Sequence, residues 1–143
     1  MRKREARQEA IRRVVRRERV RTQRDLVDDL RSAGFACTQA TVSRDITELG
    51  LKKLPEGSYV LSEDLHLQRM VEELVVSVIV TDRFVIIKAS TGTAPGVAAA
   101  LDAAGREEIL GSVAGDDTIL AIARSAEDAG VVAEYLERFR ARR

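Results

Sequence analysis

The chain of 143 residues contains very little of several residue types that other classes of protein depend on. It has one cysteine and no tryptophan, and aromatic residues make up only 3% of it. A single cysteine excludes an internal disulfide, so we expect a cytoplasmic location. With so few aromatic rings, the bases of single-stranded nucleic acids have few platforms to stack on. No apolar run reaches the roughly 18 residues of a membrane span, and the charged N-terminus predicts no signal peptide.

Residues suited to catalysis are equally scarce. The only histidine, His66, lies in a polar segment, and the only cysteine, Cys37, precedes a predicted helix with no partner for nucleophilic chemistry. The sequence shows no Gly-rich phosphate loop and no cluster with the spacing of metal ligands. We therefore interpret Cys37 as a small apolar loop residue and His66 as a surface residue. We expect no catalytic residues, no metal and no enzymatic activity.

Charge is distributed unevenly, although the net charge is only +1. Residues 1–60 carry 15 basic and 9 acidic side chains, a balance of +6, whereas residues 61–143 carry 9 and 14, a balance of −5. The first part is suited to a polyanion and the second is not. This asymmetry is what a DNA-binding domain joined to a domain of another kind would show.

Apolar spacing predicts three helices in residues 1–61, from Arg4 to about Arg19, over about 22–33, and over 38–49. Their expected capping residues are of the types that favour helix ends: Thr22 with Asp25, Gly34, Thr38 and Gly50. Two short extended segments flank a turn at Pro55-Glu56-Gly57 and predict a hairpin. Three helices followed by a hairpin define a winged helix-turn-helix domain.

The third predicted helix carries small and hydroxyl side chains around one arginine on the side opposite its apolar residues. Small residues allow a close approach to a groove floor, and arginine can form two hydrogen bonds with guanine. The alternative is an ordinary amphipathic surface helix. On motif order and charge we predict DNA contacts on this helix and phosphate contacts from the wing. The predicted DNA-binding residues are Gln39, Thr41, Ser43, Arg44, Lys52 and Lys53.

Residues 62–70 mix polar and apolar side chains and are predicted to be a linker, with a short helical turn as an alternative within it, and residues 71–143 are predicted to form the second domain. Its predicted order is ββαββα, so the whole chain has an α+β fold, and this domain has a four-stranded antiparallel sheet and two helices. The first strand is apolar on both sides: Val75, Ser77 and Ile79 are expected on one face, and Val76, Val78 and Val80 on the other. Because two helices cover only one sheet face, we predict oligomerisation through the other.

The segment Gly115-Asp116-Asp117-Thr118 places two carboxylates side by side in a turn between strands. A solvated turn explains it most simply. A metal site would need a third ligand that the sequence does not offer nearby, and a Mg²⁺-dependent enzyme would need an acid–base partner. A small cationic ligand is the remaining interpretation, since carboxylates accept charge-assisted hydrogen bonds from guanidinium or ammonium groups. From these residues alone the alternatives stay open.

Residues 38–45, 92–102 and 109–118 resemble the bacterial arginine repressor family, and the resemblance extends from about Arg4 to Phe139. It implies a winged-helix DNA-binding domain and an arginine-binding domain that assembles as a hexamer, a dimer of trimers. It also implies that L-arginine lies between the trimers as a corepressor, with no other cofactor, and that operator DNA of arginine metabolism genes is the partner. An oligomeric DNA-binding protein that needs no ligand is the alternative.

The resemblance carries over residue by residue. Ser43 and Arg44 match the family's main DNA-contacting pair, and Gln39 and Thr41 lie on the same helix. The residues that match the arginine pocket are Ala94, Asp102, Ser112, Ala114, Asp116 and Asp117. Ser112 replaces a threonine that is common there and keeps the hydroxyl. Pro95 departs from the pattern, because many relatives have a polar side chain at that position, so arginine affinity or ligand choice is expected to differ.

Overall fold

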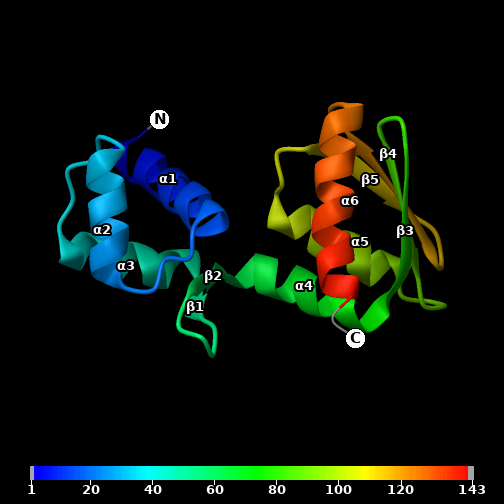
Figure 1. Cartoon of the computed structure of the whole chain (residues 1–143), viewed down its shortest axis with the longest axis horizontal. Helices are drawn as coiled ribbons and strands as arrows, with labels where there is room; N and C mark the ends of the chain where they lie inside the picture. Colours follow the sequence, from blue (N-terminus) through cyan, green and yellow to red (C-terminus); the bar gives the residue numbers. More distant parts are fainter. Residues whose placement is uncertain (1, 142–143) are drawn as a thin grey trace. The chain divides into compact units, whose positions relative to one another are not determined.

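The computed structural model describes residues 2–141, which divide into two compact units, Met1–Ser62 and Glu63–Arg143 (Figure 1). The first unit contains α1 (Lys3–Arg17), α2 (Gln23–Ser32), α3 (Gln39–Leu49), β1 (Leu51–Lys53) and β2 (Tyr59–Leu61). Along the rest of the chain follow α4 (Ser62–Leu74), β3 (Val75–Thr81), β4 (Phe84–Ala89), α5 (Ala94–Ala104), β5 (Ile109–Ala114), β6 (Thr118–Ala123) and α6 (Ala126–Arg140). Within residues 2–141, no helix has both the length and the apolar composition of a bilayer span.

The predicted ends of α2 and α3 are confirmed by their capping hydrogen bonds. Thr22 Oγ1 accepts from the backbone N–H of Asp25 at 3.0 Å, and Thr38 Oγ1 accepts from that of Thr41 at 3.2 Å. Each bond satisfies an amide that the helix itself leaves unpaired. At the other end of α3, Gly50 adopts the left-handed conformation with φ of 67°, which favours glycine. The caps at Thr38 and Gly50 determine where α3 begins and ends.

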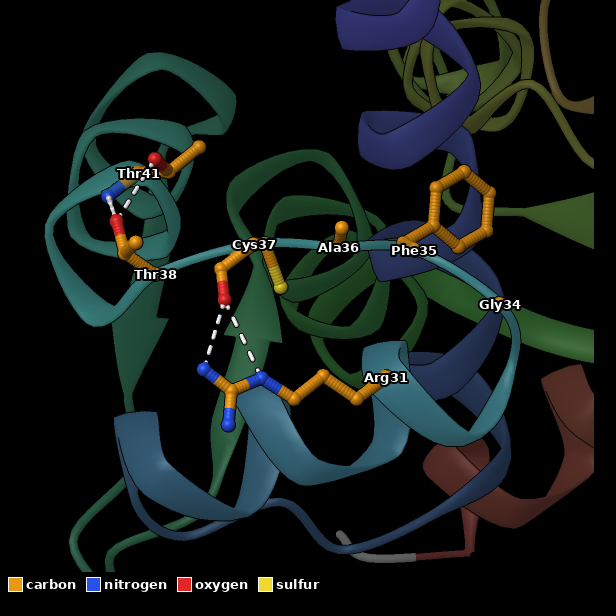
Figure 2. Close-up of a pocket in the computed structure, with 7 residues that line it drawn as sticks. All are labelled: Arg31, Gly34, Phe35, Ala36, Cys37, Thr38 and Thr41. Carbon is orange, nitrogen blue, oxygen red and sulfur yellow. Dashed lines mark hydrogen bonds between the residues drawn. The ribbon is translucent and has the colours of Figure 1, made fainter.

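The turn between α2 and α3 borders an open pocket of about 690 Å³ (Figure 2). Arg31 at the end of α2 donates to the Cys37 carbonyl from Nε and Nη2, at 3.3 and 3.1 Å. The Cys37 side chain packs into the core of the first unit and is 8% exposed. Its interpretation as a small apolar loop residue is therefore confirmed.

The wing is a two-stranded antiparallel hairpin, in which Leu51 pairs with Leu61 and Lys53 with Tyr59. Behind it, apolar side chains from α1, α2 and α3 form one core, with Ile11, Leu26 and Val42 fully buried. The predicted order of three helices and a hairpin is thus present, and the winged helix-turn-helix prediction is confirmed.

The predicted linker over residues 62–70 is wrong, because this segment forms the first two-thirds of helix α4. Leu67 and Val71 lie one turn apart on α4, and both are completely buried in the core of the second unit. Acidic residues in the first turn, Glu63 among them, favour the helix by complementing its positive N-terminal dipole. The sequence analysis missed the helical spacing of the apolar residues in this segment, because polar residues lie between them. The packing of Leu67 and Val71 in the second unit shows this spacing.

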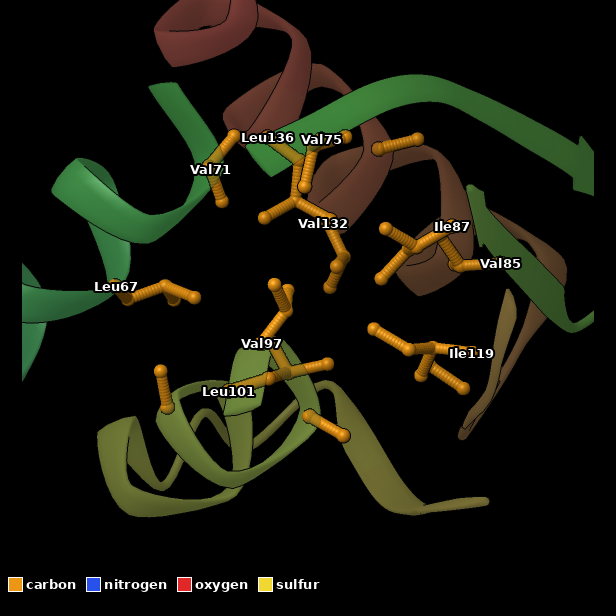
Figure 3. Close-up of a cluster of buried hydrophobic side chains, with 14 of the residues drawn as sticks. Leu67, Val71, Val75, Val85, Ile87, Val97, Leu101, Ile119, Val132 and Leu136 are labelled. Atoms are coloured by element: carbon orange, nitrogen blue, oxygen red, sulfur yellow. The ribbon is translucent and has the colours of Figure 1, made fainter. Parts of the chain in front are cut away.

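The second unit has the predicted four-stranded antiparallel sheet, and the structure shows that its strands lie in the order β3-β4-β6-β5. Side chains from α4, α5 and α6 converge on one face of this sheet (Figure 3). Val85 and Ile87 of β4 and Ile119 of β6 point into this core and are at most 1% exposed. The helices therefore cover a single face of the sheet.

The opposite sheet face carries exposed apolar side chains, and no helix within residues 2–141 packs against it. Register pairing aligns Ile79, Ile86, Leu120 and Val113 in one row across all four strands. The exposed fractions of Ile79, Leu120 and Val113 are 50%, 37% and 68%. This row lies on the face that the sequence predicts to be free for association. We call it the open sheet face.

The predicted alternation along β3 is wrong at its start. A register shift between Val75 and Ser77 forms a β-bulge, so the pattern of alternating faces changes by one residue. Val75 points into the core, whereas Ile79, which was expected on the same face, belongs to the open sheet face. Val78 packs against the core instead. A bulge reverses the face of every later residue in the strand. It could not be predicted here, because a continuous apolar run has the same pattern with or without a bulge.

Candidate nucleic-acid and ligand sites

The outward residues of α3 differ in how far their side chains are exposed to solvent. Gln39 and Arg44 are exposed, whereas Thr41 and Ser43 are half-buried. The Thr41 hydroxyl lies 3.0 Å from that of Thr38, close enough for a hydrogen bond that holds the first turn of the helix. The predicted DNA-binding residues of α3 therefore do lie on one helix outside the core, but Thr41 has a second role in capping.

Arg44 is the exposed cation at the middle of α3. Within residues 2–141 it makes no ion pair or hydrogen bond, and it borders a cavity of about 270 Å³ next to Arg4 and Arg7 of α1. Those two arginines are engaged by acids of α3, whereas Arg44 is left available. A guanidinium in this state can direct two N–H groups of one edge toward a base or a phosphate.

Helix α1 is tied to α3 by polar contacts that sequence reasoning did not anticipate. Arg7 donates to both carboxylate oxygens of Asp45, with Nη2 at 3.0 Å from Oδ1, and Gln8 Nε2 lies 3.0 Å from the same Oδ1. Arg4 and Gln8 also donate to Glu48. Asp45 is only 2% exposed. Matching spacings gave a usable signal: Arg4 and Arg7 lie three residues apart, and so do Asp45 and Glu48.

Electrostatics keep the buried Asp45 carboxylate charged. Burial by itself raises the pKa of Asp45, because it disfavours the charged form. Hydrogen bonds from Arg7 and Gln8, together with the charges of Arg7 and Arg4, outweigh that effect and lower the pKa below its ordinary value. The same hydrogen bond raises the pKa of Arg7. The arrangement therefore holds α3 in place beside α1 with an ion pair.

The two lysines of the wing are both exposed, but they lie on opposite faces of β1. Lys53 is paired with Tyr59, and its Nζ lies 5.2 Å from the centre of the tyrosine ring. Lys52 is paired with Val60 and points to the other side. Because they point to opposite sides of the wing, the two side chains cannot both face the same segment of a DNA duplex.

In the second unit, the Gly115-Asp116-Asp117 turn is fastened to the loop that precedes α5. The Asp116 carbonyl accepts from the N–H of Ala94 at 3.1 Å, and its Oδ2 accepts from the N–H of Gly92 at 3.1 Å. The Asp117 carbonyl accepts from the N–H of Ala89 at 2.7 Å. These bonds hold both carboxylates at the surface beside the start of α5, where each residue remains exposed.

A lysine from β4 lies beside the second aspartate. Lys88 Nζ lies 3.8 Å from Asp117 Oδ1, and Thr118 Oγ1 bridges them, 2.6 Å from the lysine and 2.8 Å from the carboxylate. Both charged side chains are about half exposed. A lone cation within the otherwise apolar strand β4 was the signal in the sequence for such a partner. Sequence reasoning did not use it.

The other predicted pocket residues are brought together in part. Ser112 Oγ donates to Asp102 Oδ1 at 3.0 Å, which joins β5 to α5. Ala94 is completely buried and Ala114 half-buried, so their side chains shape the surroundings of the turn. Pro95 is exposed in the first turn of α5, next to the amide that binds Asp116. Among residues 2–141 there is no group of three or more possible metal ligands.

Together these features define a class of protein: a winged-helix unit joined to an α+β unit with a surface acidic turn. Comparison with protein families is more specific. A family model described as "Arginine repressor, DNA binding domain" matches residues 2–67, and one described as "Arginine repressor, C-terminal domain" matches residues 71–138.

Curated relatives agree with the two family models. An arginine repressor of Pelotomaculum thermopropionicum is 41% identical over 142 residues, which covers 92% of this chain and 94% of the relative. One of Thermus thermophilus is 45% identical over 134 residues, covering 86% and 82%. A third, of Desulforudis audaxviator, is 42% identical over 140 residues, covering 91% and 93%. The chain belongs to the arginine repressor family, and the predicted membership is confirmed.

Proposed function

We propose that this chain is an arginine-dependent transcriptional repressor. Its first unit binds operator DNA of arginine metabolism genes, and its second unit binds L-arginine as corepressor. The observation that carries the proposal is the exposed pair Asp116 and Asp117, held by backbone hydrogen bonds in a chain that belongs to the arginine repressor family. The role is regulatory and involves no catalysis, resident cofactor or metal.

For DNA, we place α3 in the major groove and the wing against the backbone. Arg44 donates to guanine, with Gln39, Thr41 and Ser43 on the same helix, and Lys52 and Lys53 of the wing are directed to phosphates. A bidentate contact from arginine discriminates between bases by about 1–3 kcal/mol. The variant Arg44→Ala is therefore expected to lose roughly 5- to 150-fold in operator affinity and little in affinity for a scrambled duplex. Equal losses on both duplexes would refute a base contact.

For the ligand, Asp116 and Asp117 supply the negative charge that a guanidinium and an ammonium group require. The Ser112–Asp102 pair adds polar groups on neighbouring elements, and Ala94 and Ala114 shape the surroundings. We propose that the open sheet face packs into a trimer core, and that arginine binds where two trimers meet to form the hexamer. Bound arginine then neutralises carboxylates that would otherwise repel one another across the contact.

This arrangement links the ligand to DNA binding. Arginine raises the population of the hexamer, and a hexamer presents several winged-helix units to one operator at high effective concentration. Calorimetric titration with L-arginine tests the ligand site. The variant Asp117→Asn is expected to lose the heat of binding, because it removes a charge from an exposed side chain. Unchanged heats in that variant would remove Asp117 from the site.

A matched control is available in the same unit. Asp82, in the turn between β3 and β4, also carries an exposed carboxylate, and asparagine tolerates its φ of 53°. The variant Asp82→Asn is expected to bind L-arginine like the parent chain.

A ligand-independent oligomeric DNA-binding protein is the second candidate, and one observation favours it. Lys88 lies 3.8 Å from Asp117 and so provides a cation within the chain. If this lysine alone balanced the acidic turn, assembly would not need arginine. Sedimentation velocity with and without L-arginine separates the two candidates. An increase in size with arginine supports the repressor, whereas the same size under both conditions, with no heat of binding, supports the alternative.

A further inference from the structure

The wing hairpin has a third extended segment beside it, formed by the chain between α1 and α2. Glu18 and Thr22, at the two ends of this segment, both have extended backbone conformations. In its middle, the Val20 carbonyl accepts a hydrogen bond of 2.8 Å from the N–H of Tyr59 on β2. Residues 19–21 therefore run alongside β2 on the side away from β1.

Side-chain alternation places three cations on one side of this extended wing. Val20 is 2% exposed and packs into the core of the first unit, so its exposed neighbours Arg19 and Arg21 point away from that core. On β1, Leu51 packs against the same core, which directs the next residue, Lys52, to the opposite side. Arg19, Arg21 and Lys52 therefore share one surface, which we call the outer wing face.

One acidic residue adjoins these cations. Glu56 lies in the turn between β1 and β2, and the charges of Arg19 and Arg21 reach it. The Ser58 hydroxyl donates to Glu56, and this hydrogen bond is the main reason why the pKa of Glu56 is lowered. The carboxylate is thus charged at neutral pH and partly offsets the positive field of the outer wing face.

We propose that the outer wing face binds the phosphates of duplex DNA that flank the groove contacted by α3. This inference rests on the proposed function and deepens it, because it adds Arg19 and Arg21 to the phosphate contact that is proposed for Lys52. Two observations support duplex DNA as the occupant: the charge complementarity of three cations with a polyanion, and the continuity of this face with the wing. Residues two apart in an extended strand are separated by about 6.6 Å, so Arg19 and Arg21 can each reach a different phosphate.

The salt dependence of binding tests this inference directly. Each phosphate that a protein neutralises contributes about 0.9 to the slope of log K against log salt concentration. The double variant Arg19→Gln/Arg21→Gln is expected to lower that slope by about 1.8 for each DNA-bound unit. Affinity should fall by the same factor for a duplex selected from a random pool by the parent chain and for a scrambled duplex of equal composition. Phosphate contacts carry no sequence information, which explains the equal loss.

Control variants distinguish phosphate binding by the outer wing face from a general effect of net charge, and they distinguish failure of this inference from failure of the proposed function. Arg124→Gln removes an exposed, ion-paired arginine of the second unit and is expected to leave the slope unchanged. Glu56→Gln is expected to raise affinity for both duplexes, a gain that damage to the fold would not produce. An unchanged slope in the double variant, or no gain in Glu56→Gln, would overturn the inference while Arg44→Ala still weakened operator binding. If Arg44→Ala also had no effect, the proposed mode of DNA binding itself would be wrong.

Discussion

The ion pair between Arg7 of α1 and Asp45 of α3 allows a quantitative prediction. Asp45 is 2% exposed and the Arg7 side chain 15% exposed, so neither charge is well solvated. Removing one partner of such a pair costs about 3–5 kcal/mol, since the other charge stays buried and uncompensated. In Arg7→Met, Gln8 still donates to Asp45, and the cost should lie at the lower end, about 3 kcal/mol. We expect α3 to open about 150-fold more often.

Hydrogen–deuterium exchange of the full chain, read by mass spectrometry, measures this effect locally. Peptides from α1 and α3 should exchange about 150-fold faster in Arg7→Met, whereas peptides from α5 and α6 serve as an internal control and should not change. Asp45→Leu should give a comparable acceleration.

The double variant Arg7→Met/Asp45→Leu provides the decisive comparison. The double variant removes both charges and leaves none unpaired. The acceleration of amide exchange in α1 and α3 should therefore be smaller than the product of the accelerations in the two single variants. If the two single effects multiply without such recovery, or if Arg7→Met accelerates exchange less than about threefold, the ion pair does not hold α3 in the way described.

Three further predictions follow from the two sites. Lys52→Gln should weaken binding to duplex DNA more than Lys53→Gln does, because Lys53 lies over the Tyr59 ring on the other side of β1; equal losses in a fluorescence anisotropy titration would contradict this. Asp116→Ala should lower the melting temperature of the second unit more than Asp117→Ala does, since the Asp116 carboxylate accepts from the Gly92 N–H and joins two loops, whereas that of Asp117 accepts from the adjacent Thr118 hydroxyl and pairs with half-exposed Lys88; scanning calorimetry distinguishes them. Because the pKa of Asp45 is lowered in the folded chain, its contribution to stability is complete above the ordinary aspartate pKa, near 4, and is lost as pH falls below it. Circular dichroism of the parent chain should show acid unfolding there, and Asp45→Asn should flatten the profile.

Local signals in the sequence were sufficient for most of the fold. Thr22, Thr38 and Gly50 mark helix ends through hydrogen bonds and backbone conformations that depend only on nearby residues, and each prediction is confirmed. The four strands of the second unit and their antiparallel pairing were also predicted, since short apolar runs separated by turns indicate hairpins, whereas the order of the strands in the sheet was not predicted.

The errors arose where distant parts of the chain decide the outcome. Residues 62–70 form a helix because Leu67 and Val71 pack into a core built from later strands. The bulge at Val76 depends on pairing between β3 and β4. The burial of Asp45 depends on Arg7, 38 residues earlier in the chain. Composition and periodicity describe a segment by itself, so they could not reveal any of these partners.

In the candidate sites, too, the features that depend on local sequence were predicted, and those that depend on distant contacts were not. Arg44 and the Asp116–Asp117 turn were found from the sequence, and the structure places all three residues at the surface. The sequence did not predict that Lys88 lies beside Asp117, nor that a third extended segment lies beside the wing. Both features depend on how strands align.

Affinity for a selected duplex, measured with and without saturating L-arginine, tests the central proposal most directly. We expect arginine to raise the affinity roughly 5- to 150-fold, the usual range for coupling between two binding sites. Citrulline, which lacks the positive guanidinium, should leave it unchanged. The same affinity with arginine, with citrulline and with no ligand would contradict the account.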